Sequence, residues 1–205
     1  MTAGLLLPAQ AIPDQGNLAF DRVLCEQSLR DFIRQAWPTV DPAPFLSNWH
    51  IDCLAEHLEA VSRLEIRNLL INVPFRCAKS LIVSVFWPAW VWTTHPEICW
   101  LFNSYSFETL SKRDSLKTRD LITSQWYQNR WRHRVRLKKG HVRDDYFKNT
   151  ANGYRLASSV EGSNTGEGGH VLVADDPHNT QQAESDATLE MVIDWWTRVM
   201  ASRFL

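Results

Sequence analysis

The sequence is low in cysteine and has no excess of either charge. Its four cysteines form no C-x-x-C pair and no metal-ligand spacing, which argues against a disulfide framework or a zinc site and suits a reducing compartment. Lysine and arginine number 22 against 23 acids. The chain as a whole therefore creates no field that attracts nucleic acid, and any such contact must be a local patch.

Long apolar runs are also lacking. Residues 1–12 are mildly apolar, but they have no basic start and are interrupted by Pro8 and Gln10, so we expect no signal peptide and no membrane span. A chain of 205 residues can bury a substantial core, and one domain is the default for this size. We expect residues 1–43 to form a leader and a helix, and residues 44–205 to form one cytosolic domain.

Glycine is missing where one motif would ordinarily require it. Residues 69–73 are apolar and β-prone and predict a buried strand. Residues 81–92 are long enough for a helix, which Pro88 kinks or divides where the second half begins. Strand, tight turn, Lys-Ser and helix is the order of a phosphate-binding loop, G-x-x-x-x-G-K-[ST]. Lys79 and Ser80 match this template, whereas Val73 and Ala78 replace both glycines.

A second stretch, residues 171–177, is an apolar strand that ends in two carboxylates and a proline. Alone, Asp175 and Asp176 are explained by a turn that caps a helix, and Lys79-Ser80 by an ordinary helix start. Together they indicate an ATPase core of the α/β class with a mostly parallel sheet. Ligands of such sheets bind at the carboxyl ends of the strands, where Lys79 and Asp175 would meet.

These motifs resemble those of a known family. Residues 72–80 resemble the deviant Walker A of phage terminase large subunits, commonly N-x-P-P-R-H-G-K-S, and residues 104–106 are similar to the family's S-Y-S. Gly162, Thr165 and Gly166 resemble its T-G segment before an acidic Walker B. The D-W-W at 194–196 and the S-R at 202–203 resemble its terminal helix. The matches follow the family's order from about residue 44 to the last residue.

The resemblance implies a P-loop NTPase fold of the ASCE/RecA-like type and a Mg²⁺-dependent ATPase. It implies a motor that packages viral double-stranded DNA into a procapsid in the host bacterial cytoplasm. The expected partners are the DNA, a portal protein, a small terminase subunit and further copies in a ring. The chain stops where the family's coupling strand would begin, so we expect no nuclease activity.

The family's roles fall on named residues. Lys79 would contact the β- and γ-phosphates of ATP, Ser80 would ligate Mg²⁺, and Asp175 would hold the metal through water. Asp176 takes the catalytic position, and Arg76 would stabilise charge on the γ-phosphate, with pairing to a surface carboxylate as its alternative. The expected nucleotide-binding set is Pro74, Phe75, Arg76, Cys77, Ala78, Lys79 and Ser80, with Trp49 and His50 near the adenine. The alternative is that Trp49 is a core residue and His50 an N-terminal helix residue.

Three departures leave the activity open. Ala78 replaces a glycine, Cys77 stands where histidine is common, and Glu167 stands where arginine is common. An active motor and a degenerate prophage remnant that binds nucleotide or DNA without turnover both fit. A helicase-like ATPase is a third reading, although the second RecA-like domain of a helicase is missing.

One stretch is strongly basic. Residues 130–143 hold seven basic side chains and no acid, a stripe that suits DNA phosphates and equally suits the solvated face of an edge strand. The candidate DNA contacts are Arg130, Arg132, Arg134, Arg136, Lys138 and Lys139.

The remaining patterns place the other elements. We expect helices over 21–36, from about 50 to 63, over 106–124 and within 181–205, a strand over 98–102, and a hairpin turned at Asn152-Gly153. The last helix is expected to bury Leu189, Val192, Ile193, Trp196 and Val199.

Overall fold

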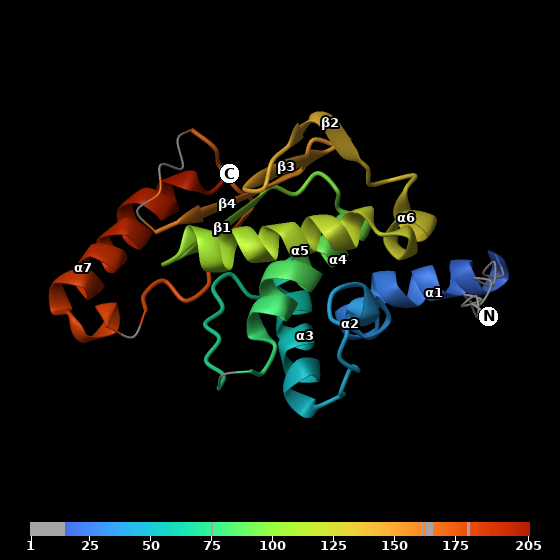
Figure 1. Ribbon diagram of the computed structural model, residues 1–205, viewed down its shortest axis with the longest axis horizontal. Coiled ribbons are helices and arrows are strands. Elements are labelled where there is room, and N and C mark those ends of the chain that lie inside the picture. The colour runs from blue at the N-terminus through green and yellow to red at the C-terminus, as the bar shows by residue number, and fades with distance from the viewer. Residues whose placement is uncertain (1–14, 75, 161, 163–165, 180) are drawn as a thin grey trace, which may run out of the picture.

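A computed structural model describes residues 15–205 except 75, 161, 163–165 and 180. Its centre is a five-stranded sheet flanked by helices (Figure 1). The strands are β1 (Trp100–Ser104), β2 (Leu137–Val142), β3 (Tyr146–Asn149), β4 (Tyr154–Ser159) and β5 (Val171–Ala174).

The sheet is mixed, so the prediction of a mostly parallel sheet is wrong. The strand order is β2-β3-β4-β1-β5; β1 is parallel to β4 and β5, whereas β3 is antiparallel to β2 and β4. The predicted hairpin causes the difference, because its turn at Asn152-Gly153 reverses the chain between β3 and β4. Asn152 has a φ of 75°, and a Cβ at Gly153 would collide with the Pro96 carbonyl, so glycine is required there.

The predicted strand over residues 69–73 is also wrong. This segment has no regular structure, and its backbone joins none of the strands described here. Leu69 and Ile71 pack against the core, while Leu70 is 84% exposed. The alternating residues therefore place one face of the segment against the core, but its backbone does not pair with a strand.

The helices form two layers. On one side lie α1 (Gln15–Gln27), α2 (Leu29–Ala36), η1 (Trp37–Thr39), α3 (Trp49–Ser62), η2 (Leu81–Phe86), α4 (Trp87–Thr94), η3 (Phe107–Ser111), α5 (Lys112–Thr123) and α6 (Gln125–Trp131). On the other lie η4 (Gln182–Glu184), α7 (Asp186–Asp194), η5 (Trp195–Met200) and η6 (Ala201–Arg203). In the described part of the chain, no helix has both the length and the apolarity needed to cross a membrane.

Alternation along β1 divides the core between these layers. Trp100 and Phe102 belong to the large cluster under α2–α6, and Leu101 belongs to a smaller cluster with Val192, Trp195 and Met200. All five residues of β1 are buried, as expected for a central strand covered on both faces.

Two helix predictions need correction. The helix expected over 21–36 is broken at Ser28, whose Oγ accepts a hydrogen bond from the Asp31 N–H (3.1 Å) and caps a separate α2. In the last helix Ile193, Trp196 and Val199 are exposed, and Trp195 and Met200 are buried in their place. The π-helical turn of η5 has more residues per turn than an α-helix, which explains why Met200 is buried rather than Val199; Ile193 lies in α7, before this turn.

Candidate functional site

The structure brings the two predicted motifs together. Lys79 Nζ lies 2.6 Å from Asp176 Oδ1 and 2.9 Å from Asp175 Oδ1. The amine comes from the helical turn that precedes η2, and the carboxylates follow β5, nearly one hundred residues later. The side chains of Lys79 and Asp175 are 23% and 12% exposed, whereas that of Asp176 is 51% exposed. One carboxylate of the cluster is therefore open to water.

The end of β1 holds the acidic turn in place. The Asp175 N–H donates to the Asn103 carbonyl (2.8 Å), and the Tyr105 N–H donates to the Asp176 carbonyl (3.0 Å). Asp176 has a φ of 47°, a conformation that aspartate tolerates better than most residues. The predicted S-Y-S segment thus lies beside the two carboxylates.

The loop before the helix reaches its shape without glycine. Arg76 and Ala78 have φ values of 65° and 58°, in the left-handed region where a Cβ costs roughly 1–2 kcal/mol. The Ala78 carbonyl accepts a hydrogen bond from the Ile82 N–H (2.9 Å), so Ala78 is where the helix begins. The unusual backbone conformation expected at Ala78 is therefore present, and such a conformation persists only where the surrounding structure holds it in place.

The charge of Lys79 depends on its two partners. Burial disfavours the protonated amine, but the bonds to Asp176 and Asp175 outweigh burial and raise its pKa. Ser84 Oγ donates a further hydrogen bond to Asp175 Oδ2 (3.4 Å). The cluster is thus a cation held between two carboxylates, an arrangement that an anionic ligand can enter by drawing the amine away.

The residues fit a magnesium ion only in part. The Ser80 hydroxyl and the Asp175 carboxylate are oxygen donors of the kind that Mg²⁺ prefers, and Mg²⁺ commonly binds one or two protein oxygens, water and substrate phosphates. Within the described residues no group of three histidine, cysteine, aspartate or glutamate side chains could hold a metal ion by itself. The donor set suits an ion that arrives with a phosphate-bearing ligand.

Other predicted contacts of the nucleotide are scattered. Trp49 is 77% exposed, with its ring edge-on to His50 at a centroid distance of 6.2 Å, so the core alternative for Trp49 is wrong. Pro74 and Arg76 are exposed and Cys77 is half-buried. Arg76 forms no ion pair with any residue that the structure describes, and Phe75 lies outside the described residues.

Sequence reasoning missed two charged residues of α5. Arg113 Nε lies 2.8 Å from Asp114 Oδ1, and the Asp114 side chain is only 4% exposed. Asp175 acts electrostatically on both of them. An Arg-Asp pair early in a polar helix resembles ordinary surface charge, so the sequence held no signal for its burial beside the site.

The basic stretch divides into two parts. Arg130 pairs with Asp21 (3.3 Å) and Arg134 with Glu26 (2.9 Å), and these ion pairs attach α6 and the following turn to α1. The exposed members, which form no ion pair within the described chain, are Arg132, Arg136, Lys138 and Lys139. The edge-strand interpretation holds only from Leu137, since β2 begins there and residues 130–136 form a helix end and a turn.

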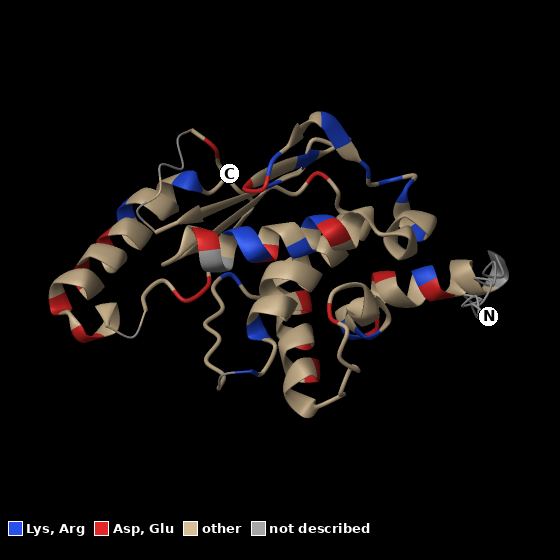
Figure 2. Ribbon diagram, in the orientation of Figure 1, with Lys and Arg blue, Asp and Glu red and all other residues tan. Residues whose placement is uncertain are grey.

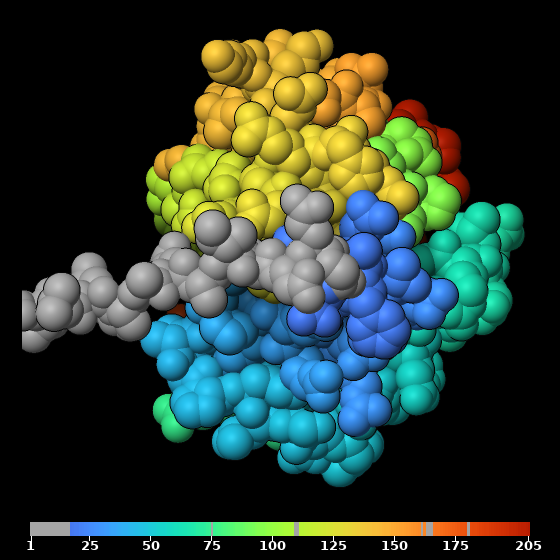
Figure 3. Space-filling view, turned by 90° about the vertical axis from the view of Figure 1, so that its right-hand side faces the viewer, coloured from blue at the N-terminus to red at the C-terminus, as the bar shows by residue number. Residues whose placement is uncertain are grey.

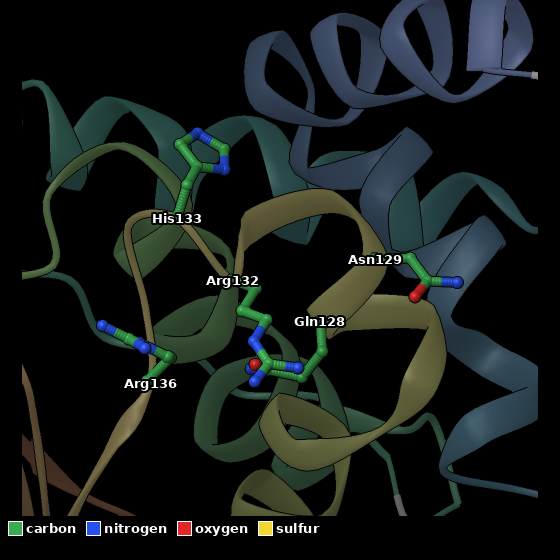
Figure 4. Close-up of a pocket in the computed structure, with 5 residues that line it drawn as sticks. All are labelled: Gln128, Asn129, Arg132, His133 and Arg136. Atoms are coloured by element: carbon green, nitrogen blue, oxygen red, sulfur yellow. The ribbon is translucent and has the colours of Figure 1, made fainter.

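Two of these unpaired basic residues, Arg132 and Arg136, line a shallow depression. It measures about 510 Å³ and is lined by Gln128, Asn129, Arg132, His133 and Arg136 (Figure 4). Its lining residues come from α6 and the turn that follows it, and Figure 3 shows this part of the chain (yellow) above α1 and α2 (blue). None of its lining residues belongs to the Lys79 cluster, so the molecule has two separate candidate sites for anions.

Comparison with known proteins gives no functional assignment, so the proposed function is argued from the geometry of the site. No protein-family model matches the chain, and no curated protein matches it.

Proposed function

We propose that the chain binds Mg-ATP at the Lys79–Asp175–Asp176 cluster and hydrolyses it, as the motor domain of a terminase-like protein that packages viral double-stranded DNA. The observation that carries the proposal is the meeting of Lys79 with two consecutive carboxylates at the carboxyl end of β5. In α/β sheets this edge is where ligands bind.

Each residue has a role in the proposed reaction. The Lys79 amine moves from the carboxylates to the β- and γ-phosphate oxygens. Ser80 and Asp175 would hold Mg²⁺, which neutralises phosphate charge when bound. The water-exposed carboxylate of Asp176 then orients a water and accepts its proton as the water oxygen bonds to the γ-phosphorus. The bond from this phosphorus to the β–γ bridging oxygen breaks, and ADP leaves with the electron pair.

DNA is the proposed polyanionic partner, and the unpaired basic residues beside the depression are its proposed contacts. Arginine and lysine side chains without carboxylate partners are available to phosphates. A portal protein, a small terminase subunit and ring neighbours remain proposals that rest on the sequence resemblance.

A second candidate is a chain that binds nucleotide without turnover. Two residues with positive φ in the loop favour it, because a strained loop has less freedom to close around phosphates. Turnover, rather than binding, separates the two candidates.

The test is Mg-ATP hydrolysis by the purified chain, with and without duplex DNA. We expect Lys79→Ala and Asp176→Asn each to lower turnover by about 100-fold or more, because the first removes a charge that stabilises the phosphates and the second removes the proton acceptor. Lys148→Ala and Asp194→Asn are matched controls, since both side chains lie outside the Lys79 cluster and the proposed DNA contacts, on β3 and α7.

The outcomes are distinct. Loss of turnover in the two site variants alone supports the motor. Binding without turnover in the parent chain supports the second candidate, and Ala78→Gly is then the variant to test for restored activity. Absence of both binding and turnover contradicts the nucleotide proposal.

A further inference from the structure

Five charged residues of alternating sign connect the sheet interior with the Lys79 cluster. In order they are Arg155 of β4, Asp114 and Arg113 of α5, Asp175 after β5, and Lys79. Figure 2 shows the acidic and basic residues that lie close together along α5. Only the end at Asp175 and Lys79 belongs to the site predicted from the sequence.

Arg155 is the buried end of this series. It is 1% exposed, its guanidinium carbon lies 3.6 Å from the centroid of the Phe102 ring, and its three side-chain nitrogens have no hydrogen-bond partner among the described residues. Burial lowers the pKa of Arg155 to about 9, so it is a cation at neutral pH. A buried cation needs a counter-charge, and Asp114 is the acid that acts on it.

Asp114 stands between two guanidinium groups. It bonds to Arg113 Nε and also feels the charge of Arg155; burial nevertheless raises its pKa. The bond occupies one nitrogen of Arg113, whose side chain is 48% exposed. The two terminal nitrogens of Arg113 form no hydrogen bond with the described residues, so these two NH₂ groups remain available to a ligand.

Hydrogen bonds fix this turn of α5 beside Asp175. Thr118 Oγ1 contacts the Asp114 carbonyl at 2.7 Å and the Ser84 carbonyl at 3.1 Å. Ser84 Oγ in turn donates to Asp175 Oδ2. The position of Arg113 relative to the carboxylates of the site is therefore set by buried contacts and does not depend on a mobile surface loop.

The charges of the cluster indicate a role for Arg113 in binding phosphate. The cations Arg155, Arg113 and Lys79 match the carboxylates Asp114, Asp175 and Asp176, so the cluster is neutral before any ligand enters. A triphosphate keeps a net negative charge even with Mg²⁺ bound, and one lysine that is already paired with two carboxylates does not balance it. Arg113 is the other surface cation of the series, and its two unengaged NH₂ groups suit bidentate contact with phosphate.

We propose that Arg113 is a second phosphate-binding cation of this site and contacts the terminal phosphate of a nucleoside triphosphate, with Asp114 as the residue that positions it. This inference rests on the proposed nucleotide binding at Lys79. The inference predicts that the site binds a nucleoside triphosphate more tightly than a diphosphate, because Arg113 contacts the terminal phosphate.

The experiment is calorimetric titration of the chain with Mg-ATP and with Mg-ADP. We expect Arg113→Gln to weaken Mg-ATP binding by about 10- to 100-fold, the effect of removing a charge-assisted hydrogen bond, and to change Mg-ADP binding less. Arg113→Lys, which keeps the charge, should weaken binding less than Arg113→Gln. Arg119→Gln is the matched control, because Arg119 lies on the same helix and pairs with Asp144 at 3.2 Å.

Circular dichroism confirms that each variant is folded before titration. If the parent chain binds Mg-ATP and Arg113→Gln binds it equally well, the role of Arg113 is refuted while nucleotide binding stands. If Arg113→Gln weakens Mg-ATP and Mg-ADP equally, its specificity for the terminal phosphate is refuted. If the parent chain binds neither nucleotide, both proposals fail.

Discussion

At the scale of single residues, the amine of Lys79 is the group on which the site depends. Its bonds to Asp176 and Asp175 hold a cation where burial alone would disfavour it. The same bonds couple the site to the stability of the fold, because the folded and unfolded states then bind the Lys79 proton with different affinity.

This coupling predicts a pH dependence. The pKa of Lys79 is raised above its ordinary value of 10.5 in the folded state. Its contribution to stability is therefore fully present below about pH 10.5 and is lost as the pH rises through the folded pKa. Urea unfolding should show wild type more stable than Lys79→Met at neutral pH, with the difference shrinking above about pH 10.5. Lys138→Met, at an exposed position on β2, should show no such trend; a constant difference for Lys79→Met would contradict the prediction.

At the scale of elements, α5 and β4 each bury a charged residue, and the two charges act on each other without forming an ion pair in the described structure. Asp114 is 3% exposed and Arg155 is 1% exposed. Buried ions are costly, and a partner left alone is costlier than a pair removed together. The packing of α5 on the sheet therefore combines apolar contacts with an electrostatic one.

The pair predicts unequal effects of two substitutions. Asp114→Asn leaves Arg155 without its counter-charge and should lower the free energy of unfolding by about 3–5 kcal/mol. Arg155→Met keeps most of the volume, removes the unpartnered nitrogens and leaves Asp114 paired with Arg113, so its effect should stay within about 1 kcal/mol or be stabilising. Urea unfolding of both variants and of the double variant measures the coupling. The double variant should recover most of the stability lost in Asp114→Asn, and additive losses would show that the two charges are independent.

At the scale of the whole molecule, balanced composition conceals an uneven surface. The net charge is −1, yet Arg132, Arg136, Lys138 and Lys139 lie together without acidic partners in the described chain. Arg130 and Arg134 belong to the same stretch, but they hold α1 against α6. Tertiary pairing, rather than the number of basic residues, decides which of them can reach a phosphate.

The surface predicts a salt-dependent interaction with duplex DNA. Replacing Arg132 and Arg136 together by glutamine should reduce the slope of log K against log salt concentration by about 2, because each phosphate that is no longer neutralised lowers the slope by about 1. Arg198→Gln removes an exposed arginine from η5 and should leave the slope almost unchanged. Fluorescence anisotropy with a labelled duplex at several salt concentrations measures both. An unchanged slope in the double variant would place any DNA contact elsewhere.

The sequence by itself determined the local features. The apolar run of β5 ending in Asp175-Asp176, the helix after Lys79-Ser80, the division of that helix at Pro88 and the turn at Asn152-Gly153 are all present. Each depends on neighbours within a few residues, through backbone preference, helix starts or turn chemistry. The meeting of Lys79 with the carboxylates was also predicted, but only half of the reason holds: Asp175 and Asp176 follow a strand, whereas residues 69–73 before Lys79 form none.

Only the tertiary structure decided the features that depend on distant partners. Residues 69–73 have the composition of a strand but no strand ladder, and the buried face of the last helix depends on its π-helical turn. Likewise, ion pairs with Asp21 and Glu26 hold Arg130 and Arg134, and β4 buries Arg155 where the charge of Asp114 acts on it. Burial and ion pairing are properties of contacts between segments far apart in the chain, and local pattern carries no information about which segments will meet.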